Sequence, residues 1–506
     1  MIVVYALLLV LLYTQDIASQ SVTVQLSNNV VQTASIGQGG TNYYYFDVQN
    51  VQNLLFRRAI PPIFITAAIC SQPASSSNSQ DAVPSLEMYI STSDSNTLPG
   101  PGKGDKVADS EYGHIAWNSS GTEARVWMSV TAPTLNGQWS GNWTFEIGAS
   151  TSQSLHTLYH NDDITDTSPS LSLDDTDRNN ALFLSNIYKT TPPNSTIIMT
   201  ASIPTELSYS SCAALLYKMP NYSVNTTLTT RGPTNDTRQQ FMVANLTQDT
   251  TYKAYMMQSS GSSNGMTLPI TVYTKTDSNC RLIYDLPFCN QVAYSVPVGQ
   301  ASYSTSDIWN ISSAYDKQAA DLFKPFDVAL TQFNCETTQY SLVRNCTDCY
   351  RDYKTWLCSV TIPRCTDSSS SSDLSQGTDN VKAAPAIRDI SVNASRNSWI
   401  DSTMEPGEWT ELLPCIDLCY HVVQSCPPFM QFYCPQGDLA AVQYGYWQTG
   451  NATVNGTLYN FDVNNPTCNR MGVNASLLTI SGATHISTLN LFLTVSTSLL
   501  LLLVLF

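Results

Sequence analysis

Hydrophobic and polar residues alternate along much of the first half of the chain. Val126, Met128 and Val130, for example, occupy every second position of a run that is bounded by polar and turn-forming residues. A period of two is typical of antiparallel strands that bury one face. We therefore expect two β-sandwich-like domains in this half, one at residues 21–150 and one at residues 180–277.

A polar, acidic stretch at residues 151–179 separates these two regions. It contains the pairs Asp162-Asp163 and Asp174-Asp175, which raises the question of calcium binding. The stretch lacks the ordered carboxylate spacing and the central glycine of an EF-hand loop. We therefore interpret it as a solvated linker between the two domains.

The spacing of hydrophobic residues becomes helical in the second half. Tyr350, Tyr353 and Leu357 fall at positions i, i+3 and i+7, on one face of a helix. The segment 278–470 is therefore expected to be a mainly helical domain with a flexible serine-rich insert at 366–384. The fold class predicted for the whole chain is multidomain β + α, with antiparallel β-sandwich-like domains followed by this helical domain.

Cysteines are concentrated in the same segment, which holds twelve of the fourteen in the chain. In an oxidising compartment such a density indicates a disulfide scaffold, and the metal-site alternative lacks a second Cys-x-x-Cys pair beside Cys346 and Cys349. Spacing alone leaves the connectivity open, including that of Cys70 and Cys212. The disulfide candidates of the segment are Cys280, Cys289, Cys335, Cys346, Cys349, Cys358, Cys365, Cys415, Cys419, Cys426, Cys434 and Cys468.

Both ends of the chain are hydrophobic. An apolar run near the start is followed by small polar residues, which is the pattern of a secretory signal peptide, and we assign it to residues 1–19. The last segment, residues 484–506, ends in an uncharged apolar run with no basic residue after it. We favour a cleaved anchor signal with a glycolipid attached at Ser481, and a transmembrane helix is the alternative.

Sequons of the type Asn-x-Ser/Thr are frequent between the two ends. In a chain that carries a signal peptide, their number predicts a heavily glycosylated exterior protein. A further sequon, at Asn474, lies next to the expected anchor. The predicted glycosylated residues are Asn118, Asn142, Asn194, Asn221, Asn225, Asn235, Asn245, Asn310, Asn345, Asn393, Asn451 and Asn455.

Composition narrows the classes of function. The net charge of −16 at pH 7 argues against nucleic acid as a partner, because contact with phosphate groups needs a basic surface. Only five histidines are present, and the chain carries no nucleophile-elbow, zinc-protease or phosphate-loop motif. We therefore expect a binding or structural protein that is not an enzyme, with no cofactor and no bound metal.

Two cysteine motifs in the second half resemble known proteins. The pattern C-S-x-x-x-P-x-C at 358–365, followed by P-C-x-x-x-C and C-x-P at 414–428, resembles the frizzled-type cysteine-rich domain. The wider layout is a signal peptide, a sequon-rich β region, a cysteine-rich domain and a hydrophobic tail. This layout is similar to that of the fungal stretch-activated calcium-channel regulatory subunit family, the yeast mating-pheromone-induced-death proteins.

The resemblance implies an extracellular regulatory or auxiliary subunit of a plasma-membrane, high-affinity, stretch-activated calcium channel that supports calcium influx. Its partner would be the pore-forming calcium-channel α subunit. Its location would be the extracellular face of the plasma membrane, reached through the secretory pathway, with the endoplasmic reticulum as a second location. The aromatic residues among the cysteines are candidate contacts, and filling a core is the simpler alternative: Tyr350, Tyr353, Trp356, Phe429, Phe432 and Tyr433.

Two other functions stay open at this stage. A lipid- or ligand-binding cell-surface glycoprotein is one, because frizzled-type domains hold acyl chains or secreted ligands in a groove. A wall-associated structural glycoprotein is the other, because many sequons and a membrane anchor suit such a protein. Mass spectrometry of the cysteine-rich domain would show a bound lipid if the first is right. A wall-associated glycoprotein predicts no channel partner in a pull-down and normal calcium uptake after deletion.

Overall fold

The structure is a computed structural model of the 506-residue chain. It divides into two compact units, each made of several segments. Unit 1 comprises Met1–Leu173, Asn179–Leu228 and Arg238–Thr274, and unit 2 comprises Asp174–Arg178, Thr229–Thr237 and Lys275–Phe506. The structure describes residues 22–48, 61–75, 83–103, 105–119, 121, 123–137, 139–160, 169–232, 236–260, 263–300, 307–334, 344–367, 386–447, 450–454, 457–461 and 466–471.

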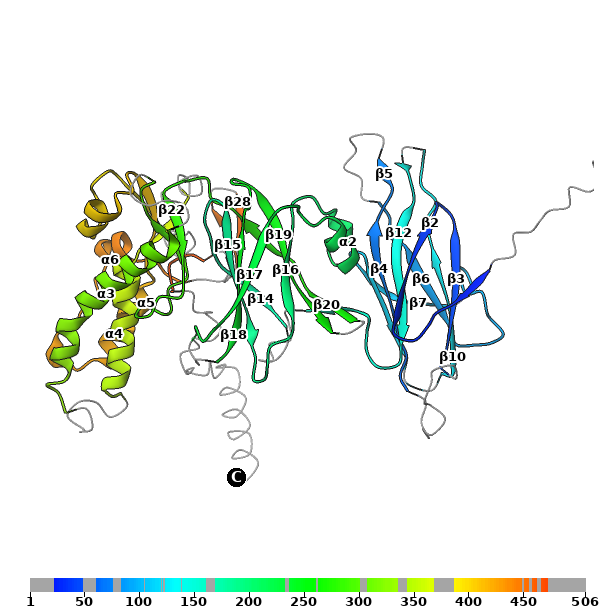
Figure 1. Cartoon of the computed structure of the whole chain (residues 1–506), viewed down its shortest axis with the longest axis horizontal. Coiled ribbons are helices and arrows are strands. Elements are labelled where there is room, and N and C mark those ends of the chain that lie inside the picture. The colour runs from blue at the N-terminus through cyan, green and yellow to red at the C-terminus, as the bar shows by residue number, and fades with distance from the viewer. Residues whose placement is uncertain are drawn as a thin grey trace, which may run out of the picture. The chain divides into compact units, whose positions relative to one another are not determined.

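The first part of unit 1 is built from two five-stranded sheets that share one core (Figure 1). Val126, Met128 and Val130 are fully buried on one sheet and meet Phe145 and Ile147 of the other, as their period of two predicts. In order across the first sheet, the strands are β1 (Thr23–Gln25), β3 (Thr41–Asp47), β10 (Arg125–Thr131), β6 (Glu87–Ser91) and β7 (Lys106–Val107). Across the second they are β2 (Val30–Ile36), β12 (Trp143–Ser150), β4 (Phe64–Ser71), β9 (His114–Asn118) and β8 (Asp109–Glu111), beside the short pair β5 (Ala74–Ser75) and β11 (Trp139–Ser140).

The second part of unit 1 also has two sheets. Phe183, Ile197 and Phe241 are fully buried between them. One sheet has the order β13 (His156–Tyr159), β20 (Ser263–Thr267), β19 (Thr251–Ser260) and β16 (Ser195–Thr200), and β21 (Ile270–Tyr273) also pairs with β19. The other has the order β14 (Leu171–Thr176), β15 (Asn180–Ile187), β18 (Arg238–Ala244) and β17 (Ser223–Thr229).

A short helical segment joins the two parts of unit 1. It comprises η3 (Thr205–Leu207) and α2 (Ser211–Leu216), and Cys212 of α2 forms a disulfide with Cys70 of β4. Leu207 and Ala213 from this segment belong to the same core cluster as the first pair of sheets. The Cys70–Cys212 pairing, which spacing had left open, therefore fastens the second part of unit 1 to the first.

The acidic stretch 151–179 is not a solvated linker along its whole length. Its residues form β13 and β14, and Asp174, Asp175 and Asp177 are buried. The expectation is wrong for these residues because each of their carboxylates has a partner inside unit 2, as described below. Residues 161–168, which include the first aspartate pair, lie outside the described residues.

Unit 2 combines helices with small sheets (Figure 1). The helices are α3 (Ile308–Leu330), α4 (Cys346–Thr361), α5 (Ile416–Ser425), α6 (Asp438–Gln443), the π-helix η5 (Ile400–Met404) and the 3-10 helix η6 (Pro428–Met430). The strands form three small sheets. One is the pair β22 (Cys280–Ile283) and β23 (Tyr294–Pro297), and another is the pair β27 (Gly450–Val454) and β28 (Thr457–Phe461). The third has the order β24 (Arg364–Thr366), β26 (Trp409–Leu412) and β25 (Ile387–Ile390).

The predicted fold class is therefore wrong for the cysteine-rich segment. This segment is not a mainly helical domain, and the described part of the chain is mostly β-sheet. The physical reason lies in the burial of the missed strands. Every residue of β22, β23 and β26 is buried, so these strands have no exposed polar face, and four residues are too few to establish a period of two.

Five disulfides between described cysteines brace unit 2. Cys346 is also disulfide-bonded, Cys335 lies outside the described residues, and no described cysteine is free. The five bonds join Cys280 to Cys365, Cys289 to Cys358, Cys349 to Cys426, Cys415 to Cys468, and Cys419 to Cys434.

Several predicted features lie outside the described residues. These are the signal peptide at 1–19, the serine-rich insert from 368 onward, Ser481 and the hydrophobic segment 484–506. Within the described ranges, no helix combines the length and the apolar character that crossing a membrane requires.

Candidate functional site

Aromatic side chains gather where α3, α4 and α5 of unit 2 pack together. Phe326 of α3 and Tyr353 of α4 stack with their ring centroids 3.7 Å apart and their planes 10° from parallel. The ring centroid of Tyr353 also lies 5.3 Å from that of Trp356 and 5.4 Å from that of Phe432. These rings border a buried cluster that includes Leu357 of α4. The structure thus brings together three of the contact candidates, and all three are partly buried.

A hydrogen bond adds to the structural role of Trp356. Its indole Nε1 donates to the hydroxyl of Tyr444, just after α6, at 2.9 Å. A buried indole usually needs such a partner for its N–H group. The bond therefore explains how this tryptophan connects α4 to the segment that follows α6.

Two other contact candidates face solvent. Phe429 is 69% exposed and Tyr433 is 83% exposed, while Tyr350 at 36% is intermediate between them and the buried rings. Phe429 stacks on Phe333, with centroids 6.1 Å apart and planes 8° from parallel. Phe429 and Tyr433 belong to residues 426–434, which we call the aromatic loop.

Disulfides fix both ends of the aromatic loop. Cys426 is bonded to Cys349 of α4, and Cys434 is bonded to Cys419 of α5. Prolines occupy the two positions after Cys426, and a proline ring restricts φ. A loop that is held in this way loses little conformational entropy when a partner covers it.

Sequence reasoning missed two residues beside this loop. Tyr420 and Val423 on α5 are 44% and 42% exposed. Tyr420 directly follows Cys419, which the disulfide to Cys434 joins to the end of the aromatic loop. The inward face of α5 is already filled by other apolar residues, and this excess of apolar residues was the available signal.

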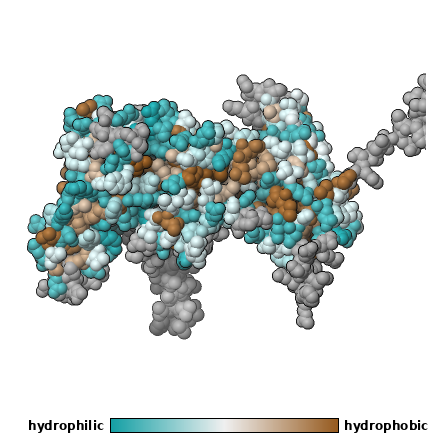
Figure 2. Space-filling model, viewed as in Figure 1, coloured by the Kyte–Doolittle hydropathy of each residue, from teal (hydrophilic) through white to brown (hydrophobic). Residues whose placement is uncertain are grey.

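The surrounding surface is mostly hydrophilic. On the face drawn in Figure 2, the part of unit 2 that holds α3 and α4 is mainly teal, with scattered brown and tan patches. Asp321 of α3 pairs with Lys317 and Lys324 at 2.7 and 2.6 Å, and these hydrogen bonds lower its pKa to about 2. Exposed apolar rings within a charged surface are typical of a surface that binds another protein.

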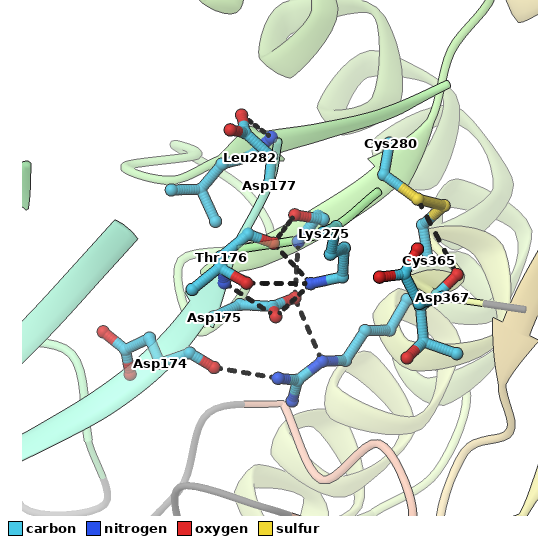
Figure 3. A network of polar contacts seen from close by, with 12 residues as sticks. Asp174, Asp175, Thr176, Asp177, Lys275, Cys280, Leu282, Cys365 and Asp367 are labelled. Carbon is cyan, nitrogen blue, oxygen red and sulfur yellow. Dashed lines mark hydrogen bonds and ion pairs between the residues drawn. A yellow bond between two sulfur atoms is a disulfide. The ribbon is translucent and has the colours of Figure 1, made fainter. Parts of the chain in front are cut away.

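Unit 2 also contains a buried ionic network (Figure 3). At its centre, Asp175 Oδ1 accepts from Lys275 Nζ at 2.6 Å, and Oδ2 accepts from Arg364 Nε at 3.1 Å and from the backbone N–H of Ser295 at 2.8 Å. Burial by itself raises the pKa of Asp175. The positive charges of Arg364 and Lys275, together with the hydrogen bonds, outweigh burial and hold this pKa below its usual value.

The neighbouring carboxylates are paired as well. Asp174 forms a two-pronged ion pair with Arg231 at 2.6 and 2.8 Å, and Asp177 accepts from the backbone N–H of Leu282 at 3.2 Å. Asp367 accepts from the N–H and the hydroxyl of Thr276 at 2.9 and 2.7 Å. The arrangement leaves these carboxylates engaged with the protein itself, and the removal of one partner would leave an uncompensated buried charge.

Among the described residues, the metal-ligating side chains that come together in a group of three are Cys70, Glu146 and Cys212. The two cysteines are joined to each other by a disulfide. Their sulfur atoms are therefore not thiolates, and thiolates are the form of cysteine that binds metals.

The predicted glycosylation sites lie at the surface wherever their side chains are described. Asn235 and Asn455 lie outside the described residues, as does the side chain of Asn451. Glycosylation stays a prediction at all of these positions. The exposed asparagines are Asn118, Asn142, Asn194, Asn221, Asn225, Asn245, Asn310, Asn345 and Asn393.

Comparison with known proteins relates this chain to channel components. Residues 62–473 match the model of the Mid1 family, described as a stretch-activated Ca²⁺-permeable channel component. The stretch-activated cation channel yam8 of Schizosaccharomyces pombe is 35% identical over 233 residues, which are 45% of this chain and 44% of the relative. The stretch-activated cation channel MID1 of Saccharomyces cerevisiae is 35% identical over 255 residues, which are 48% of this chain and 41% of the relative.

The matched segment spans less than half the length of these relatives. Among solved structures, a marsupial T cell receptor is 9% identical, and the match covers 48% of this chain and 94% of the receptor chain. Its TM-score of 0.14 is too low to indicate a shared fold. The family model, in contrast, covers most of the chain. This protein therefore belongs to the Mid1 family of stretch-activated Ca²⁺-permeable channel components, which is not a family of enzymes.

Proposed function

We propose that this protein is an extracellular auxiliary subunit of a stretch-activated calcium channel and supports calcium influx by docking onto the pore-forming α subunit. Membership of a family of channel components supports a channel partner. The disulfides support an extracellular location, because such bonds persist in oxidising compartments. The signal peptide at 1–19 and an anchor at Ser481 would bring the protein to the outer face of the plasma membrane.

The aromatic loop is the observation that carries the docking proposal. Phe429 and Tyr433 are the two most exposed of the contact candidates, and disulfides to α4 and α5 hold the loop that presents them. Large aromatic residues provide much of the binding energy at protein interfaces. Tyr420 and Val423 would extend the contact along α5. Membrane anchoring would raise the effective concentration of the subunit near its partner without any further contact.

The pore-forming subunit is the partner that best fits this surface. A loop with exposed aromatic rings, few charges and a fixed shape suits a structured protein surface with complementary apolar pockets. Within the loop, the partly buried Phe432 packs against Tyr353 of α4 and would support the loop from the core side. We therefore place the contact at Phe429 and Tyr433, with the buried aromatics as their support.

The test is co-purification of the pore-forming subunit with the tagged chain from fungal membranes. The variant F429A/Y433A should capture at least about tenfold less of it, because truncating two interface aromatics costs more than about 1.4 kcal/mol. The secreted amount and the thermal unfolding of the variant should stay unchanged, since both side chains are exposed.

The matched control is W309A. Trp309 is 78% exposed and lies at the first turn of α3. Helix α3 is about 33 Å long, and Phe333, which stacks on Phe429, follows its other end. W309A should capture the channel like the unmodified chain. Normal capture by F429A/Y433A would refute the docking site, and no capture by the unmodified chain would refute the proposed function.

A further inference from the structure

In the second part of unit 1, five of the described strands pair on one side only: β13, β14, β16, β17 and β21. An edge strand exposes backbone N–H and C=O groups that can pair with another chain. At β16, the Tyr222 hydroxyl donates to the carbonyl of Ile197 at 3.0 Å and accepts from the N–H of Met199 at 3.3 Å. The N–H of Met219 donates to the carbonyl of Met199 at 2.9 Å. The backbone of β16 is therefore covered from within the chain.

Side chains also engage the backbones of β13 and β14. The ring Nε2 of His114 donates to the carbonyl of His156 in β13 at 2.8 Å. In β14, the carbonyl of Asp174 accepts from Arg364 at 2.9 Å and that of Thr176 accepts from the hydroxyl of Ser295 at 2.6 Å. Three of these five edges are thus engaged by hydrogen bonds within the protein. The short strand β21 directly follows Pro269, which has no backbone N–H to offer to another strand.

Strand β17 is different. It pairs with β18 on one side, and none of the described strands pairs with its other side. Its sequence, Ser-Val-Asn-Thr-Thr-Leu-Thr, contains no charged residue and no proline, and Leu228 is 60% exposed. An uncharged edge strand rich in β-branched residues favours pairing with strands of other molecules. Natural edge strands usually carry a charged residue or a proline, or are covered by a helix or loop.

Two predicted glycosylation sites lie at this edge. Asn225 is inside β17 and Asn221 precedes the strand, and both side chains are exposed. Tyr222 and Val224 pack against the core, so Asn225, the next residue after Val224, points to the opposite, solvent-facing side of the sheet. A glycan on Asn225 would therefore stand beside the open edge and hinder the approach of another strand.

We propose that N-linked glycans on Asn221 and Asn225 shield the open edge of β17 against strand pairing with a second copy of this chain. The glycans would keep another strand away from β17, as the hydrogen bonds from Tyr222 and Met219 do at β16. The proposal rests on the secretory route that is part of the proposed function. It concerns the solubility of the protein and not its contact with the channel, so the two can be tested separately.

The test uses the full chain secreted from a glycosylating host. Glycopeptide mass spectrometry of the unmodified protein should find both Asn221 and Asn225 occupied. The variant S223A/N225Q removes both sequons and keeps Asn221, whose φ of 65° suits asparagine better than most residues. Thr227 is left in place because its hydroxyl accepts from Gln240 at 3.2 Å. Size-exclusion chromatography with light scattering should show a several-fold smaller monomer fraction for this variant.

Two further variants separate glycan shielding from misfolding. S223A/N225K puts a charge on the bare edge and should restore the monomer fraction, which a folding defect would not allow. N142Q/N310Q removes two glycans from exposed positions outside β17 and should stay monomeric. Unoccupied sites in the unmodified protein, an S223A/N225Q variant as monomeric as N142Q/N310Q, or a lack of rescue by N225K would each overturn the proposal.

Discussion

At the scale of single residues, Asp175 shows why charge in a sequence is a poor guide to exposure. Its partners Lys275 and Arg364 lie 100 and 189 residues away along the chain. Nothing near Asp175 in the sequence indicates these pairings, so an acidic stretch was interpreted as solvated. Burial of a carboxylate between two cations is a property of the folded unit, and only the structure brings these residues together.

The substitution Asp175→Asn should destabilise unit 2 strongly. It leaves Lys275 and Arg364 buried without their shared counter-charge. We expect a loss of about 3–5 kcal/mol in the free energy of unfolding, measured by urea unfolding with the disulfides intact. Asp94→Asn is the control, because Asp94 is 75% exposed and lies 3.7 Å from Arg125. It should cost less than about 1 kcal/mol, and equal losses for the two variants would contradict this role of the network.

The same carboxylate gives this prediction a pH dependence. Folding lowers the pKa of Asp175, so its contribution to stability is fully present above the unfolded-state pKa of about 3.9 and is lost as the pH falls through the lowered folded-state value. The stability difference between the unmodified protein and D175N should therefore shrink below about pH 3.9. A difference that stayed constant to lower pH would count against a charged Asp175.

At the scale of elements, strands with one exposed face were predictable and strands buried on both faces were not. Val126, Met128 and Val130 alternate with less buried residues along much of β10, and the alternation locates the strand. All four residues of β26 are buried, so the pattern that would mark a strand is absent. The disulfide pairing was equally hidden, because the bonded cysteines lie between 15 and 142 residues apart.

The aromatic loop was predictable in part. The sequence predicts Phe429, Phe432 and Tyr433 as contact candidates because they lie among the cysteines, but it does not indicate which of the three rings face solvent. The structure buries part of Phe432 and exposes the other two. Helix packing decides this difference, because Phe432 turns toward Tyr353 and Phe326.

Removal of the Cys419–Cys434 bond tests how the loop is held. This bond closes a segment with a sequence separation of 15, and C419S/C434S should cost about 3 kcal/mol of unfolding free energy. It should also speed proteolysis of the aromatic loop and weaken capture of the pore-forming subunit, because the loop loses one of its two attachments.

A second bond serves as the control. C280S/C365S opens a longer segment, with a separation of 85, and should cost more, about 4–5 kcal/mol. It should leave proteolysis of the aromatic loop unchanged under native conditions. Equal proteolysis of the loop in both variants would show that the Cys419–Cys434 bond does not order it.

At the scale of the whole molecule, some features stabilise the fold and others are available for contact with a partner. The disulfides and the Asp175 network hold unit 2 together, and the exposed rings at 429 and 433 are the part left for a partner. In unit 1, the predicted glycosylation sites at the β17 edge are the feature that we propose to keep the protein from pairing with a second copy. The family assignment fits this division, since a channel component needs a surface for its channel and has no need of a catalytic centre.

The most direct test is calcium uptake at low external calcium by cells that lack this protein. Uptake should fall when the gene is deleted and recover when the unmodified chain is returned. W309A should also restore uptake, whereas F429A/Y433A should reach the cell surface and fail to restore it. Uptake that is unchanged by the deletion, or fully restored by F429A/Y433A, would contradict the proposed role.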